Sequence, residues 1–445
     1  MSNFLSNELT KMKKIHYTFF AVLFCSTLSA QTDPKLLTKL SQQAEQIEPK
    51  MIEWRRYFHE HPELSNREFK TGAKIAEQLK AMGMEVQYPV AKTGVVALLK
   101  GGKPGPVVAL RSDIDGLPIT ERNSLPFASK EKSTFGGQET GVMHACGHDG
   151  HMSILLAVAE ILSKNKSELK GSVKFIFQPA EEGAPTGEEG GAALMIKEGV
   201  LENPKVDAIF GLHIQSLIPL GQVSYRAEGL MASVDGVNIK VKGKGAHGAT
   251  PWDSVDPIVV SSQIILGLQT IISRQTELTK AAAVITVGSF HAGIRRNIIP
   301  EEALMEGTIR TFDPDMQKIV HEKIKKTAID IAESAGAKAE VDIQIMYPVT
   351  YNDPKFTAMM APSLSRAVGN ENVKVISPVT MAEDFSFFQQ KIPGFFFFVG
   401  ANSKDMKLEK QPTHHTADFM IDERCMLTGV KSLLTLTVDY LNMKK

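Results

Sequence analysis

Cysteine is scarce in this chain, with three residues in 445. Small extracellular modules that are held together by disulfides carry more, so the sequence does not belong to that class. Cys25 lies in an N-terminal segment of unusual character, which leaves Cys146 and Cys425 in the remainder. One bridge between these two is open on the sequence alone.

Charge of one sign is also missing, since fifty basic and fifty acidic residues cancel. Such a balance gives no indication of a nucleic-acid partner or of a polyanionic one. There is no internal repeat and no low-complexity tract, and after residue 30 we find no apolar run of the length that a membrane helix needs. The composition is that of an ordinary globular protein, and its length favours two domains.

The first thirty residues differ from everything after them. Three lysines precede an apolar run over residues 17–25, and small residues ending in Ala30 follow. That order is typical of a secretory signal and is too short for a mature membrane helix. Phe24 stands where a lipoprotein signal needs a small residue before Cys25, so lipidation is disfavoured. We predict a signal peptide over residues 1–30, a secreted or periplasmic protein, and no membrane contact beyond secretion.

Short apolar runs alternate with helical patterns along much of the chain. This alternation predicts an α/β fold with a doubly wound, mostly parallel sheet. Polar residues directly follow several of the strands, and the carboxyl ends of parallel strands meet in one crevice, so we expect a single site. The expected helices cover residues 36–79 and 152–164, and the expected strands cover residues 95–100, 107–111, 173–177, 208–213 and 395–399.

The pattern changes between about residues 227 and 339. Its order of strands and helices is βαββαβ, the ferredoxin-like arrangement, which predicts an inserted domain. The main domain would then consist of residues 31–226 and 340–445, with the insert over residues 227–339. The elements of the insert are strands at 237–241, 283–289, 304–311 and 340–346, and helices at 256–274 and 316–334.

Residues 143–151, with the sequence MHACGHDGH, place one thiol, three imidazoles and a carboxylate in a short segment. Zinc-type ions bind Cys thiolate and neutral His, and the spacing of Cys146 and His148 lets both side chains project to one side of a glycine-containing loop. An isolated Cys-x-His is equally compatible with a second interpretation, in which the cysteine is a buried apolar residue and the histidines are polar residues at a helix end. We favour the metal-ligand interpretation, under which Cys146 is not free to pair with Cys425.

The pair Glu181-Glu182 follows a predicted strand in the phrase FQPAEEG. Adjacent side chains point in different directions, so one carboxylate can bind a metal ion while the other faces a water molecule. Acid pairs are common on solvated surfaces, but the apolar strand before this one and Gly183 after it favour a crevice. Asp113 and Asp115 follow another strand and either orient a ligand imidazole or have a structural role.

A series of motifs extends from residue 54 to residue 423. Together they resemble the M20 metallopeptidase family, and specifically its amidohydrolase branch of hippurate hydrolases, N-acyl-amino-acid amidohydrolases and plant auxin-conjugate hydrolases. The resemblance implies a catalytic main domain, an inserted lid and dimerisation domain, and a homodimer. The motifs are MHACGHDGH, FQPAEEG, GLHIQSLIPLG, VKGKGAHGATPWDSVDP, RRNIIPEEA, EGTIRTF, VTMAEDFSFF and PTHHTADFMIDE.

The resemblance also implies a centre of two divalent metal ions, which could be zinc, manganese, cobalt or nickel. Counting back from Asp422-Glu423 favours His414 over His415 as the late ligand, whereas His144 and His151 match no ligand position. The implied ligands are Cys146, His148, Glu182, His213 and His414; the implied catalytic residues are the general base Glu181 and His247; and the implied substrate-binding residues are Asn297 and Arg310.

The expected function is therefore that of a secreted, metal-dependent amidohydrolase acting on N-acyl amino acids or small peptides with a free α-carboxylate. Water activated by the metal ions would attack the amide, His247 would approach the oxyanion, and Arg310 would hold the carboxylate unless it merely pairs with Glu306. An aminopeptidase-type hydrolase would instead need a pocket for a free amine. A non-catalytic metal-binding or peptide-binding relative is disfavoured by the presence of Glu181.

Overall fold

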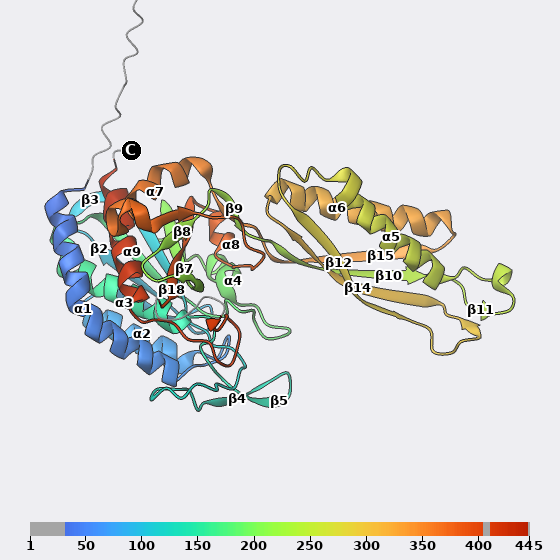
Figure 1. The fold of residues 1–445 in the computed structure, drawn as a ribbon, viewed down its shortest axis with the longest axis horizontal. Helices are drawn as coiled ribbons and strands as arrows, with labels where there is room; N and C mark the ends of the chain where they lie inside the picture. Colours follow the sequence, from blue (N-terminus) through green and yellow to red (C-terminus); the bar gives the residue numbers. More distant parts are fainter. Residues whose placement is uncertain (1–31, 404–409, 444–445) are drawn as a thin grey trace, which may run out of the picture.

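The computed structural model describes residues 32–403 and 410–443, and the predicted signal peptide lies outside them. The chain forms a large domain and an elongated small domain that projects from it (Figure 1).

An eight-stranded sheet lies at the centre of the large domain in the order β1-β2-β6-β3-β7-β18-β8-β17. The middle strands β6 (Lys170–Gln178), β3 (Lys103–Asp113), β7 (Ala208–Pro219) and β18 (Gly394–Asn402) are all parallel. At one edge β1 (Glu85–Val90) and β2 (Gly94–Lys100) are antiparallel, because the short turn between them allows only a hairpin. At the other edge β8 (Val223–Tyr225) opposes β18, and β17 (Val373–Val375) is parallel to β8. The α/β fold with a large, mostly parallel sheet is confirmed.

Helices cover both faces of this sheet, which is why its strands are apolar throughout. β18 illustrates the point: Phe395 and Phe397 belong to one buried cluster, and Phe396 and Phe398 to another on the opposite face. The first face is covered by α1 (Pro34–Glu60), α2 (Phe69–Ala81), α3 (His148–Lys164), α7 (Pro354–Val368) and α9 (Cys425–Asn442), and the second by α4 (Gly191–Lys197) and α8 (Ser386–Gln389).

The single helical stretch expected over residues 36–79 is in fact two helices. α1 ends at Glu60 with His61 as its C-cap, Pro62 comes next, and Asn66 has a positive φ of 60°, so the backbone leaves the helical region before α2 begins at Phe69. The hydrophobic periodicity is helical on both sides of this interruption, which is why the sequence pattern predicts one continuous helix.

The small domain is a four-stranded sheet in the order β12-β14-β10-β15, packed against two helices. Its elements follow one another as βαββαβ, in agreement with the sequence pattern. They are β10 (Val234–Lys242), α5 (Pro257–Gln275), β12 (Ala283–Ala292), β14 (Glu302–Thr311), α6 (Pro314–Ser334) and β15 (Lys338–Tyr347), with a short pair, β11 (Ala246–His247) and β13 (Ile298–Ile299), at the far tip (Figure 1).

The predicted bounds of this domain, residues 227 and 339, are wrong at both ends. β9 (Glu228–Met231) pairs with β16 (Thr350–Asn352), outside the small-domain sheet. β15 pairs with β10 along its whole length, from Lys338 to Tyr347. The sheet pairing therefore places the small domain at residues 234–347.

Helix α5 has the length and apolar composition of a membrane span, which contradicts our expectation that no such run follows residue 30. Its inner side packs on the small-domain sheet through Val260, Ile264 and Leu268. On its outer side Val259 is 54% exposed and Leu266 is 70% exposed. The outer side is mixed, because Ser262, Gln263 and Gln269 are exposed among these apolar residues.

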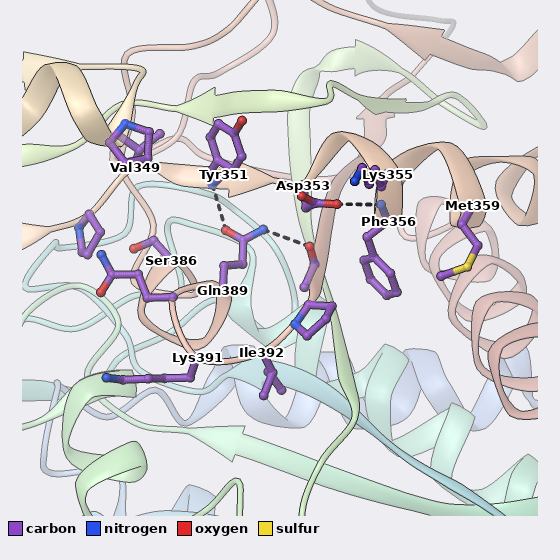
Figure 2. A pocket seen from close by; sticks show the side chains of 15 residues that line it. Val349, Tyr351, Asp353, Lys355, Phe356, Met359, Ser386, Gln389, Lys391 and Ile392 are labelled. Carbon is purple, nitrogen blue, oxygen red and sulfur yellow. Dashed lines mark hydrogen bonds between the residues drawn. The ribbon is translucent and has the colours of Figure 1, made fainter. Parts of the chain in front are cut away.

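The connection that follows β15 is fastened to the large domain. The backbone N–H of Tyr351 donates to Gln389 Oε1 at 2.9 Å (Figure 2), and Asn352 Nδ2 donates to the carbonyl of Phe396 at 2.8 Å. Any pivot of the small domain must therefore lie before Tyr351 on this crossing.

Candidate active site

The polar segments that follow the central strands converge on one cleft of about 350 Å³. β7 contributes His213, the loop after β6 contributes Glu181 and Glu182, and the loop before α3 contributes Cys146. Arg310, at the end of β14, reaches the same cleft from the small domain. The geometry agrees with the prediction of a single crevice at the carboxyl ends of the parallel strands.

The metal-type donors lie within contact of one another. Cys146 Sγ is 3.3 Å from His213 Nε2 and 3.3 Å from His415 Nε2, and His415 Nε2 is 3.0 Å from Glu182 Oε1. His148, Glu181 and Glu182 form a second group whose ligand atoms lie within 4.8 Å of one another. Two groups that share Glu182 would suit a centre of two metal ions.

The buried atoms in this cluster fit a cation. His148 Nε2 is buried without a hydrogen-bond partner, an arrangement that costs free energy unless another group satisfies it. Although burial disfavours the charged imidazole, the nearby carboxylates of Asp113 and Asp115 raise the pKa of His148 to about 10. The same carboxylates stabilise a metal ion that replaces the proton.

Backbone carbonyls fix the orientation of the ligand imidazoles. His148 Nδ1 lies 2.8 Å from the carbonyl of Asp115, and His213 Nδ1 lies 2.6 Å from the carbonyl of Ile214. With Nδ1 engaged in this way, Nε2 is left to bind the ion. His151 is a supporting residue, since its Nδ1 lies 2.7 Å from Asp113 Oδ1 and its Nε2 accepts from the N–H of Ile214.

The geometry favours His415 over the predicted His414 as the late ligand, and the assignment stays a prediction. His414 Nε2 is 2.9 Å from the carbonyl of Ile214, and burial lowers the pKa of His414 to about 4, so its ring is neutral and bonded away from the cluster. His415 has a left-handed φ of 60°, and its N–H donates to the carbonyl of Ala145. This local turn directs the His415 side chain to Cys146, which counting along the sequence does not reveal.

Sequence analysis missed a buried ion network beneath Glu181. Arg111 of β3 lies 2.8 Å from Asp113, 2.8 Å from Asp384 and 2.9 Å from Glu383. Burial, followed by the charge of Glu383, raises the pKa of Glu181 well above its usual range. A charged residue inside the apolar strand VVALRSD was the signal that could have indicated it.

The substrate-side residues of the small domain separate into two groups. Arg310 donates through Nη1 to the carbonyl of Thr380 at 3.3 Å, whereas Glu306 accepts from Ser289, so the alternative pairing of Arg310 with Glu306 is not observed. His247 and Asn297 are both exposed, and the N–H of Gly248 donates to the carbonyl of Asn297, which places the two residues close together. β11, which contains His247, lies at the tip of the small domain (Figure 1), and neither residue lines the cleft. The structure therefore joins Arg310 to the metal-type donors but not His247 or Asn297 of the same chain.

A larger cavity, of about 650 Å³, lies next to the inter-domain connection and contains none of these residues (Figure 2). Gln389, at its wall, uses its amide group on Tyr351, Asn352 and Gly394. The cleft is the smaller of the two, but it is the one in which charged and metal-binding groups converge, so it is the candidate for catalysis.

A family model described as peptidase family M20/M25/M40 matches residues 109–439. The chain belongs to this family. N-acetylcysteine deacetylase from Bacillus subtilis is 40% identical over 397 residues, covering 89% of this chain and 98% of the relative. Thermostable carboxypeptidase 2 from Saccharolobus solfataricus is 39% identical over 409 residues, covering 92% of this chain and 99% of the relative.

The solved structure of a dinuclear metal-binding peptidase of the M20 family from Bacillus subtilis is similar to this M20 chain at a TM-score of 0.74 and 36% identity, covering 90% of this chain and 100% of that one. These comparisons confirm the resemblance drawn from the motifs. The protein is a metal-dependent hydrolase of the amidohydrolase and carboxypeptidase type, with a centre of two divalent metal ions.

Proposed function

We propose that this M20 enzyme is a secreted amidohydrolase that releases amino acids from N-acyl amino acids or small peptides with a free α-carboxylate. The observation that carries the proposal is the position of Arg310 in the same cleft as Glu181 and Cys146. Among the described residues its one hydrogen bond is to the carbonyl of Thr380, so most of its N–H groups remain for a substrate. Its planar fork matches a carboxylate bidentately.

In this proposal the chain itself performs the proton transfers and the positioning. Two metal ions, held by Cys146, His148, Glu182, His213 and His415, would polarise the scissile carbonyl and lower the pKa of water in the cleft. Glu181 takes the proton of the attacking water and delivers it to the leaving amine. Arg310 fixes the α-carboxylate, which sets the amide bond against Glu181.

The rival functions are less well supported by the cleft. An aminopeptidase needs an acidic group free to bind a substrate amine, but Glu181 and Glu182 belong to the metal-type groups, and the remaining charged group is the cation Arg310. A non-catalytic relative has no need of a buried carboxylate with a raised pKa at the position of Glu181. Secretion rests on residues 1–30 and is tested by comparing culture supernatant or periplasm with cytoplasm.

The substrate prediction compares an N-benzoyl amino acid with its C-terminal amide. Loss of the carboxylate leaves the guanidinium of Arg310 desolvated and unpaired, which costs on the order of 2 to 5 kcal/mol of binding free energy. The kcat/KM for the amide should therefore fall by one to several decades. In Arg310→Ala this difference should largely disappear, and treatment of the wild-type enzyme with a chelator should abolish hydrolysis of both compounds. Equal kcat/KM values for the two compounds would instead indicate a general amidase.

We also propose a homodimer in which His247 and Asn297 of one chain enter the cleft of the other. The proposal is supported by their position at the exposed tip of the small domain and by the exposed apolar side chains of Val259 and Leu266 on α5. β12 and β15 are edge strands of their sheet within the described chain, and pairing of an edge is a common route to a dimer.

The dimer prediction is tested by mixing two inactive variants, His247→Ala and Glu181→Gln. If His247 acts across the interface, one of the two clefts in a mixed dimer has both an intact Glu181 and an intact partner His247, so part of the activity returns. The control is each variant on its own, either unfolded and refolded or taken through the same mixing procedure without the other variant. Absence of any recovery in proven heterodimers would place His247 in the cleft of its own chain.

A further inference from the structure

The two acids of the cleft lie on a short segment after β6, residues 179–183, which we term the carboxylate turn. Its backbone is left-handed near both ends, with φ of 53° at Ala180 and 106° at Gly183. Two buried acids of the large domain hold its N–H groups: Glu68 Oε1 accepts from Ala180 at 2.9 Å, and Asp115 Oδ2 accepts from Glu182 at 3.0 Å. Because the turn belongs to no helix or strand, its conformation depends on such side-chain contacts.

A third contact to this turn comes from the small domain. The hydroxyl of Tyr347 donates to the carbonyl of Glu181 at 2.7 Å, and Tyr347 lines the cleft. Burial, followed by the charge of Glu181, raises the pKa of Tyr347 far above the working range of an enzyme, so the hydroxyl keeps its proton and remains a donor. The peptide group that carries the proposed base is thus held by a residue of the other domain.

We propose that Tyr347 is a positioning residue that aligns Glu181 and makes this alignment depend on the position of the small domain. The direction of the Glu181 carbonyl and the direction of its side chain are set by the same backbone dihedrals, so fixing one constrains the other. The inference rests on the proposed function, in which Glu181 is the base.

The small-domain sheet connects this contact to the carboxylate-binding residue. Tyr347 of β15 pairs in register with Val234 of β10, and the adjacent Asp235 pairs with Ile309 of β14, next to Arg310. Three hydrogen-bonded strands therefore link the residue that would bind the substrate carboxylate to the residue that holds the base. Substrate bound at Arg310 steadies the sheet in the position at which Tyr347 reaches Glu181.

The test is Tyr347→Phe in the metal-loaded full-length enzyme, with Tyr88→Phe as the matched control. Tyr88 makes the same kind of bond at the same length, 2.7 Å to the carbonyl of Phe69, but contributes nothing to the cleft lining. We expect kcat for an N-benzoyl amino acid to fall about tenfold in Tyr347→Phe, the effect of one well-placed hydrogen bond, with KM and metal content within twofold of wild type. Tyr88→Phe should change none of the three.

Hydrogen exchange of the backbone amides of residues 180–183 supplies a readout that needs no turnover. We expect faster exchange in Tyr347→Phe than in wild type or Tyr88→Phe, and unchanged exchange overturns the inference whether or not N-acyl amino acids are substrates. If the wild-type enzyme does not hydrolyse N-acyl amino acids but amide exchange in the carboxylate turn is still faster in Tyr347→Phe, only the proposed function is contradicted. If the fall in kcat is accompanied by a rise in KM or by loss of metal, the role of Tyr347 is merely structural, and this result would also overturn the inference.

Coupling to the small domain is measured with the double variant Arg310→Ala/Tyr347→Phe. If the two residues act through one sheet position, the loss in kcat of the double variant is smaller than the product of the two single losses. Strictly multiplicative losses would overturn the dependence on the small domain.

Discussion

Glu181→Gln is expected to slow turnover by about 10² to 10⁴, the usual effect of losing a general acid or base, while both metal ions stay bound. Gln keeps the size of the side chain and removes its ability to take a proton. The measurement is kcat on an N-acyl amino acid together with metal analysis of the same preparation. Glu181 is buried, so the isosteric change is the appropriate one, since a smaller residue would also leave a cavity.

Glu182→Gln is the matched control, because it alters the neighbouring residue by the same atoms. Glu182 contacts His415 and shares both donor groups, so this variant should lose metal as well as rate. If Glu182→Gln keeps its metal and Glu181→Gln loses it, the roles within the pair are reversed.

His415→Ala is expected to lower metal occupancy and to reduce turnover to near background. The reason is geometric: His415 Nε2 lies within reach of both Cys146 and Glu182, so its removal opens one of the two ion positions. Metal content after dialysis, measured beside kcat with and without added metal, is the readout. Partial recovery at high metal concentration would be consistent with a weakened site.

His414→Ala separates this interpretation from the one that counting along the sequence favoured. His414 is bonded to the carbonyl of Ile214 and packs against Phe419, so its loss should cost stability and leave metal content close to wild type. Retention of metal in His415→Ala with loss in His414→Ala would restore the original assignment.

The pair His414 and His415 shows why part of the site could not be predicted. Composition and motif order indicate that a histidine follows β18, but which of two adjacent rings turns inward depends on one φ angle and one hydrogen bond to Ala145. Cys146 and Glu182, by contrast, stand in motifs whose spacing already indicated metal binding, and the structure brings them together. Their roles as ligands remain predictions until metal content is measured.

The fold was largely predictable because its strands and helices have regular apolar patterns. Strand β18 and helix α5 are near their expected positions, since a buried strand needs a continuous apolar run and an amphipathic helix a period of 3.6 residues. The upper domain bound was set at residue 339 although the strand expected at 340–346 belongs to the insert, and β15 pairs with β10 along that strand. The separation of His247 from the cleft was also beyond the sequence, since a motif gives the type of residue but not the distance between two domains.

The place of β18 in its sheet affects how the protein folds while it is being synthesised. β18 lies between β7 and β8, yet residues 234–347 of the small domain are made between β7 and β18. The small domain can fold as soon as it emerges, while the central sheet waits for four consecutive phenylalanines from near the end of the chain. During that wait β7 presents an unpaired apolar edge, a hazard for aggregation that a chaperone or rapid elongation would have to cover. His415 emerges later still, so the group that it forms with Cys146 and Glu182 can close only after β18 has been made.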